Sequence, residues 1–139
     1  MLKVSRQPDG QPEIFHSIQG EGVYAGKPAV FIRLALCNLA CVWCDTRYTW
    51  DWDRCDQRED VMTISLDDAG EAIRRYGCPN VVITGGEPLV QQRQLTPLLE
   101  RLKGCGFWIE VETNGTIAPG KKLVELVDHW SVSPKLENS

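Results

Sequence analysis

The chain has 139 residues, of which 42% are hydrophobic and 24% are charged, and its 15 basic and 19 acidic residues give a net charge of −4. This length and composition fit one globular domain, and the acidic balance argues against a general nucleic-acid coat protein, because binding to phosphates needs a basic surface. No apolar run approaches the roughly 20 residues of a membrane span, and the N-terminal segment lacks the apolar core of a secretion signal. We therefore expect a cytoplasmic protein that binds neither nucleic acid nor membranes.

The hydrophobic pattern predicts alternating strands and helices from residue 29 onward. A nearly continuous apolar run predicts a strand over residues 29–36, and the polar and aromatic stretch over residues 45–63 predicts a long loop with room for one short helix. The other predicted elements are helices over residues 65–76, 92–103 and 121–128, and strands over residues 81–84, 107–111 and 130–132. No strand or helix is predicted in the first 28 residues, which are rich in glycine, proline and glutamine and end in a turn.

Strands that alternate with helices indicate βαβ units and a parallel sheet. Residues suited to chemistry directly follow each of the four predicted strands, namely Cys37, residues 84–87, residues 112–114 and Ser133. Ligands bind at the carboxyl ends of the strands in such sheets. We therefore expect these residues to meet in one site.

Three of the six cysteines, Cys37, Cys41 and Cys44, lie within eight residues of one another, directly after the first predicted strand. Thiolate sulfur is a soft ligand that suits iron–sulfur clusters. Three thiolates leave one iron of a cubane open, and an open metal position is typical of a catalytic site. The alternatives are a structural zinc site with Cys55 as the fourth ligand, and three buried cysteines that bind no metal.

The other cysteines carry less information. We expect Cys78 and Cys105 to be small core residues. Cys55 has no assigned role beyond the zinc alternative. With no secretion signal, a disulfide framework is not expected.

The string from Cys37 to Thr46 has an aromatic residue, Trp43, before its third cysteine, and it resembles the radical S-adenosylmethionine superfamily. Two further strings, FHSIQGEG at residues 15–22 and TGGEP at residues 84–88, make the chain similar to the 7-carboxy-7-deazaguanine synthase family. The resemblance extends from about residue 12 to residue 138.

This resemblance implies an enzyme of queuosine and 7-deazapurine biosynthesis, a carbon–nitrogen lyase. Cys37, Cys41 and Cys44 would bind a [4Fe–4S] cluster whose open iron chelates S-adenosylmethionine, and reductive cleavage would give a 5′-deoxyadenosyl radical. The family converts 6-carboxy-5,6,7,8-tetrahydropterin to 7-carboxy-7-deazaguanine by ring contraction with loss of ammonia. It also uses Mg²⁺, and Thr46 matches the ligand position. The alternative for Thr46 is a hydroxyl that caps a loop.

The resemblance also implies binding residues at matching positions. The S-adenosylmethionine contacts would be Trp43, Cys44, Asp45, Gly86, Ser133, Pro134 and Lys135, with Glu112 and Asn114 as further candidates for the ribose. The substrate contacts would be Ile18, Gln19, Gly20, Arg33 and Thr84. No catalytic residue is assigned beyond the cluster and the cofactor.

Arg33 also stands out on physical grounds, because it interrupts an otherwise apolar strand. A guanidinium in that position needs an anionic partner, and its planar fork fits a carboxylate. The resemblance makes that partner the carboxylate of the substrate. The alternative is a structural ion pair with an internal acid.

For the fold, the resemblance implies a partial (β/α) barrel of the radical SAM type. We expect residues 1–139 to form a single radical SAM core domain with about four βα units, and the family's C-terminal strands to be missing. A homodimer and an electron donor such as flavodoxin or ferredoxin are the expected partners beside the pterin. Two other functions stay open: an activase of a glycyl-radical enzyme, and a noncatalytic iron–sulfur or zinc module.

Overall fold

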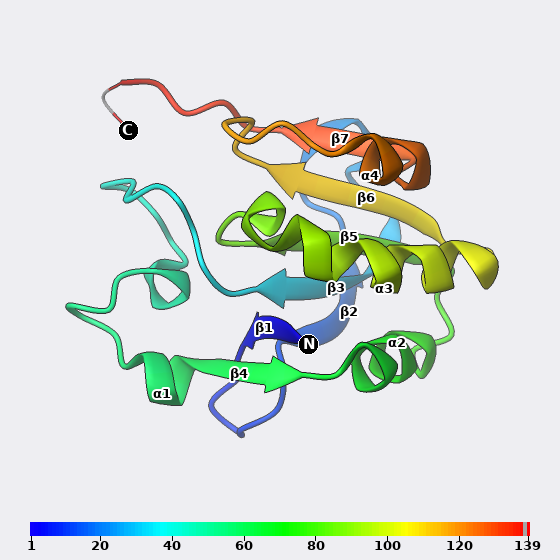
Figure 1. The fold of residues 1–139 in the computed structure, drawn as a ribbon, viewed down its shortest axis with the longest axis horizontal. Coiled ribbons are helices and arrows are strands. Elements are labelled where there is room, and N and C mark those ends of the chain that lie inside the picture. The colour runs from blue at the N-terminus through cyan, green and yellow to red at the C-terminus, as the bar shows by residue number, and fades with distance from the viewer. Residues whose placement is uncertain (138) are drawn as a thin grey trace.

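The computed structural model describes residues 1–137 and 139, and within them the chain forms one mixed sheet of seven strands covered by helices (Figure 1). The strands are β1 Leu2–Ser5, β2 Ile14–Ile18, β3 Pro28–Leu34, β4 Val61–Ile64, β5 Asn80–Gly85, β6 Trp108–Thr113 and β7 His129–Val132. The helices are α1 Gln57–Asp60, α2 Leu66–Arg74, α3 Gln92–Gly104 and α4 Lys121–Leu126, with 3-10 turns η1 Gly22–Tyr24, η2 Arg47–Thr49 and η3 Pro88–Gln91.

The centre of the sheet is parallel, as the alternation of strands and helices predicts. Strands β3, β5, β6 and β7 lie side by side and run in the same direction, within the order β4-β1-β3-β5-β6-β7. Helices α2, α3 and α4 lie on one face of this sheet (Figure 1). The carboxyl ends of the four parallel strands therefore share one edge.

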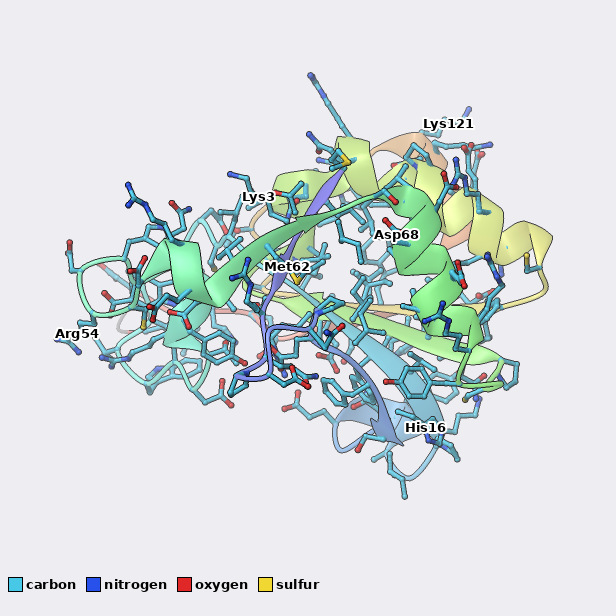
Figure 2. All side chains as sticks on the ribbon, turned by 90° about the horizontal axis from the view of Figure 1, so that it is seen from below. Lys3, His16, Arg54, Met62, Asp68 and Lys121 are labelled. Carbon is cyan, nitrogen blue, oxygen red and sulfur yellow. The ribbon has the colours of Figure 1, made fainter. Side chains whose placement is uncertain are left out.

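The two faces of the parallel strands differ in chemistry because neighbouring side chains of a strand point to opposite faces. On β3, Val30, Ile32 and Leu34 are fully buried in the main core, which also contains residues of α2, α3 and α4. The alternate residues Ala29 and Phe31 belong to a second, small cluster. Figure 2 shows the same two sides, with Lys121 on the helix side and His16 of β2 on the opposite side.

The three predicted helices are present as α2, α3 and α4, and their ends lie within two residues of the predicted ones. The Ser65 side chain accepts a hydrogen bond from the Asp68 backbone N–H and so caps α2. Gly77, with φ of 65°, follows this helix in the left-handed conformation that favours glycine. The apolar stripe of α3 is fully buried and consists of Leu95, Leu98, Leu99 and Leu102. No helix in the described part of the chain has the length and apolar character that a membrane span needs.

The prediction missed three strands, β1, β2 and β4, all antiparallel to their neighbours. Strand β2 pairs with β3 along its whole length. Strand β1 pairs with β4 along its whole length and with β3 at one position, Val4 opposite Leu34. Strands β1 and β4 have four residues each, and β2 is exposed over most of its length. None of them carries the continuous apolar run of a buried parallel strand. The predicted loop over residues 45–63 is accordingly wrong from Val61, where β4 begins.

The two cysteines expected in the core have different environments. Cys78 is buried in the main core, as predicted. Cys105 is exposed, so that prediction is wrong. It follows the last residue of α3 and forms the C-cap, a position that leaves its side chain outside the apolar stripe of the helix.

Candidate functional site

A cavity of about 510 Å³ opens at the carboxyl ends of the parallel strands. Every residue assigned above to the cluster, to Mg²⁺, to S-adenosylmethionine or to the substrate lines this cavity, except Pro134. These residues are Ile18, Gln19, Gly20, Arg33, Cys37, Cys41, Trp43, Cys44, Asp45, Thr46, Thr84, Gly86, Glu112, Asn114, Ser133 and Lys135. Segments more than 100 residues apart in the sequence thus meet at one edge of the sheet.

The three clustered cysteines lie on the loop that follows β3. All three thiols are free and partly buried. Burial raises the pKa of the Cys37 thiol above its ordinary value. The Trp50 indole N–H donates to Cys44 Sγ at 3.3 Å, so this sulfur is held on one side by a side chain from the end of the loop.

Thr46 does not act as a loop cap. Its side chain makes no capping hydrogen bond to the 3-10 turn η2 that follows it. The Thr46 hydroxyl instead lies 3.5 Å from Cys44 Sγ, on the wall of the cavity.

The backbone after β5 lies directly against the residues that precede the cysteine loop. The Gly86 N–H donates to the Leu34 carbonyl oxygen at 3.0 Å, and the Glu87 N–H donates to the Leu36 carbonyl oxygen at 2.8 Å. A Cβ on Gly86 would lie 2.2 Å from the Leu36 oxygen, and one on Gly85 would lie 2.1 Å from the Leu34 oxygen. Only glycine allows this approach, which fixes the start of the cysteine loop.

Glu87 is fully buried and joins two walls of the cavity. Its Oε1 accepts hydrogen bonds from the Leu89 N–H and the Thr113 hydroxyl, both at 2.9 Å. Its Oε2 accepts a hydrogen bond from the Asn114 N–H at 2.7 Å. The carboxylate therefore ties the loop after β5 to the end of β6.

Gln19 is buried under the cavity and joins β2 to β6. Its side-chain amide donates to Glu112 Oε1 at 2.9 Å and to Glu110 Oε1 at 3.2 Å. Glu110 is itself buried, and this burial raises its pKa. The amide of Gln19 is thus held in one orientation by two carboxyl groups on the same face of β6.

Arg33 forms the ion pair that the sequence left open as an alternative, and it also lines the cavity. Its Nε donates to Glu13 Oε1 at 2.8 Å. The Tyr48 hydroxyl donates to the same carboxylate, at 3.1 Å from Oε2. Burial lowers the pKa of Arg33, but the hydrogen bond and charge of Glu13 outweigh it and the pKa is raised. Burial raises the pKa of Tyr48 to about 12.

The last wall of the cavity comes from the segment after β7. Lys135 Nζ donates to the Ser133 hydroxyl at 2.7 Å and lies 4.8 Å from the centre of the Trp43 ring. A cation over an indole face is attracted by the ring quadrupole. This contact joins the cysteine loop to the end of the sheet.

The model of the Radical SAM superfamily matches residues 32–133, which is most of the chain. The chain belongs to the radical SAM superfamily. This agrees with the three-cysteine loop at the carboxyl end of β3 and confirms the predicted α/β fold class.

Within the radical SAM superfamily, the chain is similar to proteins named 7-carboxy-7-deazaguanine synthase. It is 44% identical to the one from Pyrobaculum aerophilum over 130 residues, which cover 91% of this chain and 55% of that protein. It is 42% identical to the one from Neisseria meningitidis serogroup B over 140 residues, which cover 97% of this chain and 58% of that protein. The chain thus spans a little over half the length of these relatives.

A solved structure has the same fold. The crystal structure of QueE from Escherichia coli matches this chain with a TM-score of 0.71 and 33% sequence identity. The match covers 97% of this chain and 61% of that chain. The fold of the described residues is therefore shared over nearly their whole length.

Membership of the radical SAM superfamily implies a [4Fe–4S] cluster and S-adenosylmethionine, and the cavity fits both. Its three cysteine thiols are free, and each thiolate of a cubane binds a different iron. No three histidine, cysteine or acidic side chains among the described residues converge enough to hold a single metal ion. Cys55, the candidate fourth ligand of a zinc site, is not among the residues that line the cavity.

Several residues of the radical SAM site were missed by sequence reasoning. Glu13 and Glu110 hold other site residues in place, and Phe15 and Phe31 line the cavity as a stacked pair with ring centres 5.3 Å apart. Glu87 was expected at the site, but its role as a tie between two cavity walls was not. Glu110 had a signal, because an acid inside an apolar strand needs a partner. Glu13 had none, because it precedes a strand that was not predicted.

Proposed function

We propose that this chain is the catalytic core of a 7-carboxy-7-deazaguanine synthase, which converts 6-carboxy-5,6,7,8-tetrahydropterin to 7-carboxy-7-deazaguanine. The observation that carries the proposal is the single cavity at the carboxyl ends of β3, β5, β6 and β7. It is lined by the candidate ligands of the cluster, the cofactor and the substrate together. The similarity to proteins of that name supports the choice of reaction.

Cys37, Cys41 and Cys44 would hold the [4Fe–4S] cluster. When bound and reduced, the cluster supplies the electron for cleavage of S-adenosylmethionine and so makes radical chemistry on the substrate possible. The Trp50 N–H that donates to Cys44 Sγ would lower the electron density on that sulfur, because hydrogen bonds to ligand sulfurs tune a cluster.

S-adenosylmethionine would occupy the part of the cavity between the cysteine loop and the ends of β5, β6 and β7. Gly86 lines this part of the cavity and would contact the amino acid portion of the cofactor. Trp43, Asp45, Ser133 and Lys135 would contact the rest of the molecule, with Pro134 beside them. Glu112 and Asn114 offer a carboxylate and an amide to the ribose.

The substrate would lie on the face of the sheet away from the helices, beside β2, β3 and the end of β5. The two amide hydrogens of Gln19 are held by carboxyl groups, so Gln19 would present its Oε1, which also accepts from the Glu21 N–H, to a pterin ring, and Ile18 and Gly20 flank it. Arg33 would bind the substrate carboxylate and Thr84 a ring substituent. The stacked pair Phe15 and Phe31 gives this side an apolar wall.

The finer assignments follow from the same proposal. Mg²⁺ would take the Thr46 hydroxyl as one ligand and complete its shell with water and substrate oxygen, as this ion prefers. An electron donor such as flavodoxin or ferredoxin would reduce the cluster. The working form would be a homodimer.

The test is anaerobic reconstitution of the whole chain with iron and sulfide. We expect close to four irons per chain and an electron paramagnetic resonance signal that changes when S-adenosylmethionine is added. With reductant and 6-carboxy-5,6,7,8-tetrahydropterin, mass spectrometry is expected to detect 7-carboxy-7-deazaguanine.

Two variants separate the cluster ligands from other cysteines. Cys41→Ala is expected to lose the iron and the spectral response together. Cys105→Ala, which changes an exposed thiol outside the cavity, is the matched control and is expected to keep both. Full cofactor cleavage by Cys41→Ala, or a cluster that does not respond to S-adenosylmethionine, contradicts the proposal.

A further inference from the structure

The Glu13 carboxylate lies between the cavity-lining Arg33 and Tyr48 of the turn that follows the cysteine loop. Arg33 is bound to Glu13 at two points, because its backbone N–H donates to the Glu13 carbonyl oxygen at 3.0 Å and its Nε donates to Oε1 at 2.8 Å. The Tyr48 hydroxyl lies 3.1 Å from Oε2 and 3.3 Å from Oε1. We propose that Glu13, supported by Tyr48, is a positioning residue that orients the Arg33 guanidinium toward the carboxylate of the pterin. This inference rests on the proposed function.

The register of the sheet explains why Glu13 reaches Arg33. Ile14 of β2 lies opposite Ile32 of β3, so the residues one step further along, Glu13 and Arg33, face each other across the same pair of strands. The two side chains lie on the face of β3 that carries Ala29 and Phe31, away from the helices. The pairing of backbone therefore sets the distance between the acid and the guanidinium.

The ion pair leaves part of the guanidinium available to a ligand. Among the described residues, the side-chain hydrogen bond of Arg33 uses Nε. A guanidinium has five N–H donors in a planar fork, so the hydrogens on the two Nη atoms remain. A second carboxylate can bind this other edge while Glu13 holds Nε, and the plane of the group is then fixed before the ligand arrives.

The benefit of Glu13 is geometric, because its negative charge works against the binding of an anion. The Arg33 and Glu13 side chains are only 19% and 15% exposed, so the pair is held with little solvent around it. The Tyr48 hydroxyl donates to the same carboxylate, 3.1 Å from Oε2, and holds it from a second side. A neutral side chain that keeps an acceptor oxygen at position 13 is therefore expected to preserve the function.

The experiment compares two ligands on the reconstituted full chain with S-adenosylmethionine, by anaerobic titration calorimetry. The ligands are 6-carboxy-5,6,7,8-tetrahydropterin and 5,6,7,8-tetrahydropterin, which lacks the carboxylate. Glu13→Ala is expected to weaken binding of the carboxylated pterin about tenfold, as loss of one charge-assisted hydrogen bond predicts, and to change binding of the other by less than about twofold. Glu71→Ala, on an exposed face of α2, is the control and is expected to change neither.

The conservative variants complete the test. Glu13→Gln keeps an acceptor oxygen, so its dissociation constant for the carboxylated pterin is expected to stay within about threefold of the wild type. Tyr48→Phe is expected to weaken binding of the same pterin by about threefold. Equal loss of both ligands in Glu13→Ala, or no loss of either, overturns the positioning role. Failure of the wild-type chain to bind either pterin contradicts the proposed function itself, which distinguishes the two failures.

Discussion

The contact between Gly86 and the start of the cysteine loop gives a prediction that can be worked out from distances. In Gly86→Ala, the new Cβ would lie 2.2 Å from the Leu36 oxygen and 3.0 Å from Cys37 Cβ. Real Cβ contacts start at about 3.0 Å, so the two backbone segments must separate by at least about 0.8 Å. Such a shift breaks the hydrogen bond from the Glu87 N–H to Leu36, now 2.8 Å long.

The energetic cost follows from two terms. Overpacking of a well-packed site costs about 1–3 kcal/mol, and a lost hydrogen bond about 1 kcal/mol. We therefore expect the free energy of unfolding of Gly86→Ala to fall by about 2–4 kcal/mol. Because Cys37 directly follows Leu36, we also expect the variant to retain less iron after anaerobic reconstitution. Urea unfolding followed by tryptophan fluorescence measures the first effect, and an iron assay the second.

Gly104→Ala is the matched control, because a Cβ at this helical position meets nothing within 4 Å. Its free energy of unfolding is expected to stay within about 1 kcal/mol of the wild type, with any change stabilising. Its iron content is expected to be unchanged. A Gly86→Ala variant with the stability and iron content of the wild type refutes the reasoning.

Two buried acids give further predictions. The folded-state pKa of Glu110 lies above its ordinary value near 4.5, because burial disfavours the charged form. The native chain therefore binds more protons than the unfolded chain does in this pH range. Its free energy of unfolding falls as the pH rises from 4.5 through the raised pKa. Glu110→Gln keeps an oxygen that can accept from Gln19, and it is expected to remove this fall. The measurement is the urea midpoint as a function of pH. If the variant shows the same slope as the wild type, Glu110 is not the cause of the fall. Glu87→Gln places an amide N–H against the backbone N–H of Asn114, and its free energy of unfolding is expected to fall by about 2–3 kcal/mol. The control is Glu100→Gln on the surface, for which the fall is expected to be under about 0.5 kcal/mol. Equal urea midpoints for these two variants count against the role of Glu87 as a tie between cavity walls.

The parallel part of the fold was predictable because its signals are local. Leu95, Leu98, Leu99 and Leu102 follow the helical period, and all four are fully buried. The strand around Ile32 is an apolar run that only Arg33 interrupts, as is typical of a buried parallel strand. The convergence of the site followed from topology alone, since the carboxyl ends of parallel strands share an edge.

The rest depended on contacts that the sequence does not encode locally. Strand β1 has four residues and is fixed by β4, which lies more than 50 positions away. Arg33 signalled that it needed an anion, but its partner Glu13 lies 20 residues earlier, before a strand whose pattern is weak. The helical pattern over residues 121–128 also predicts Val124 on the core side, but Val124 is half exposed whereas its neighbour Leu123 is buried.

The alternation along β3 has a consequence for insertions and deletions. Val30 and Ile32 fill the main core, while Phe31 and Arg33 lie on the cavity side of the same strand. One residue added within this strand would turn every later side chain to the opposite face, placing a guanidinium under the helices and an aliphatic chain in the cavity. Length changes are therefore expected in residues 51–55, which belong to no helix or strand and do not line the cavity.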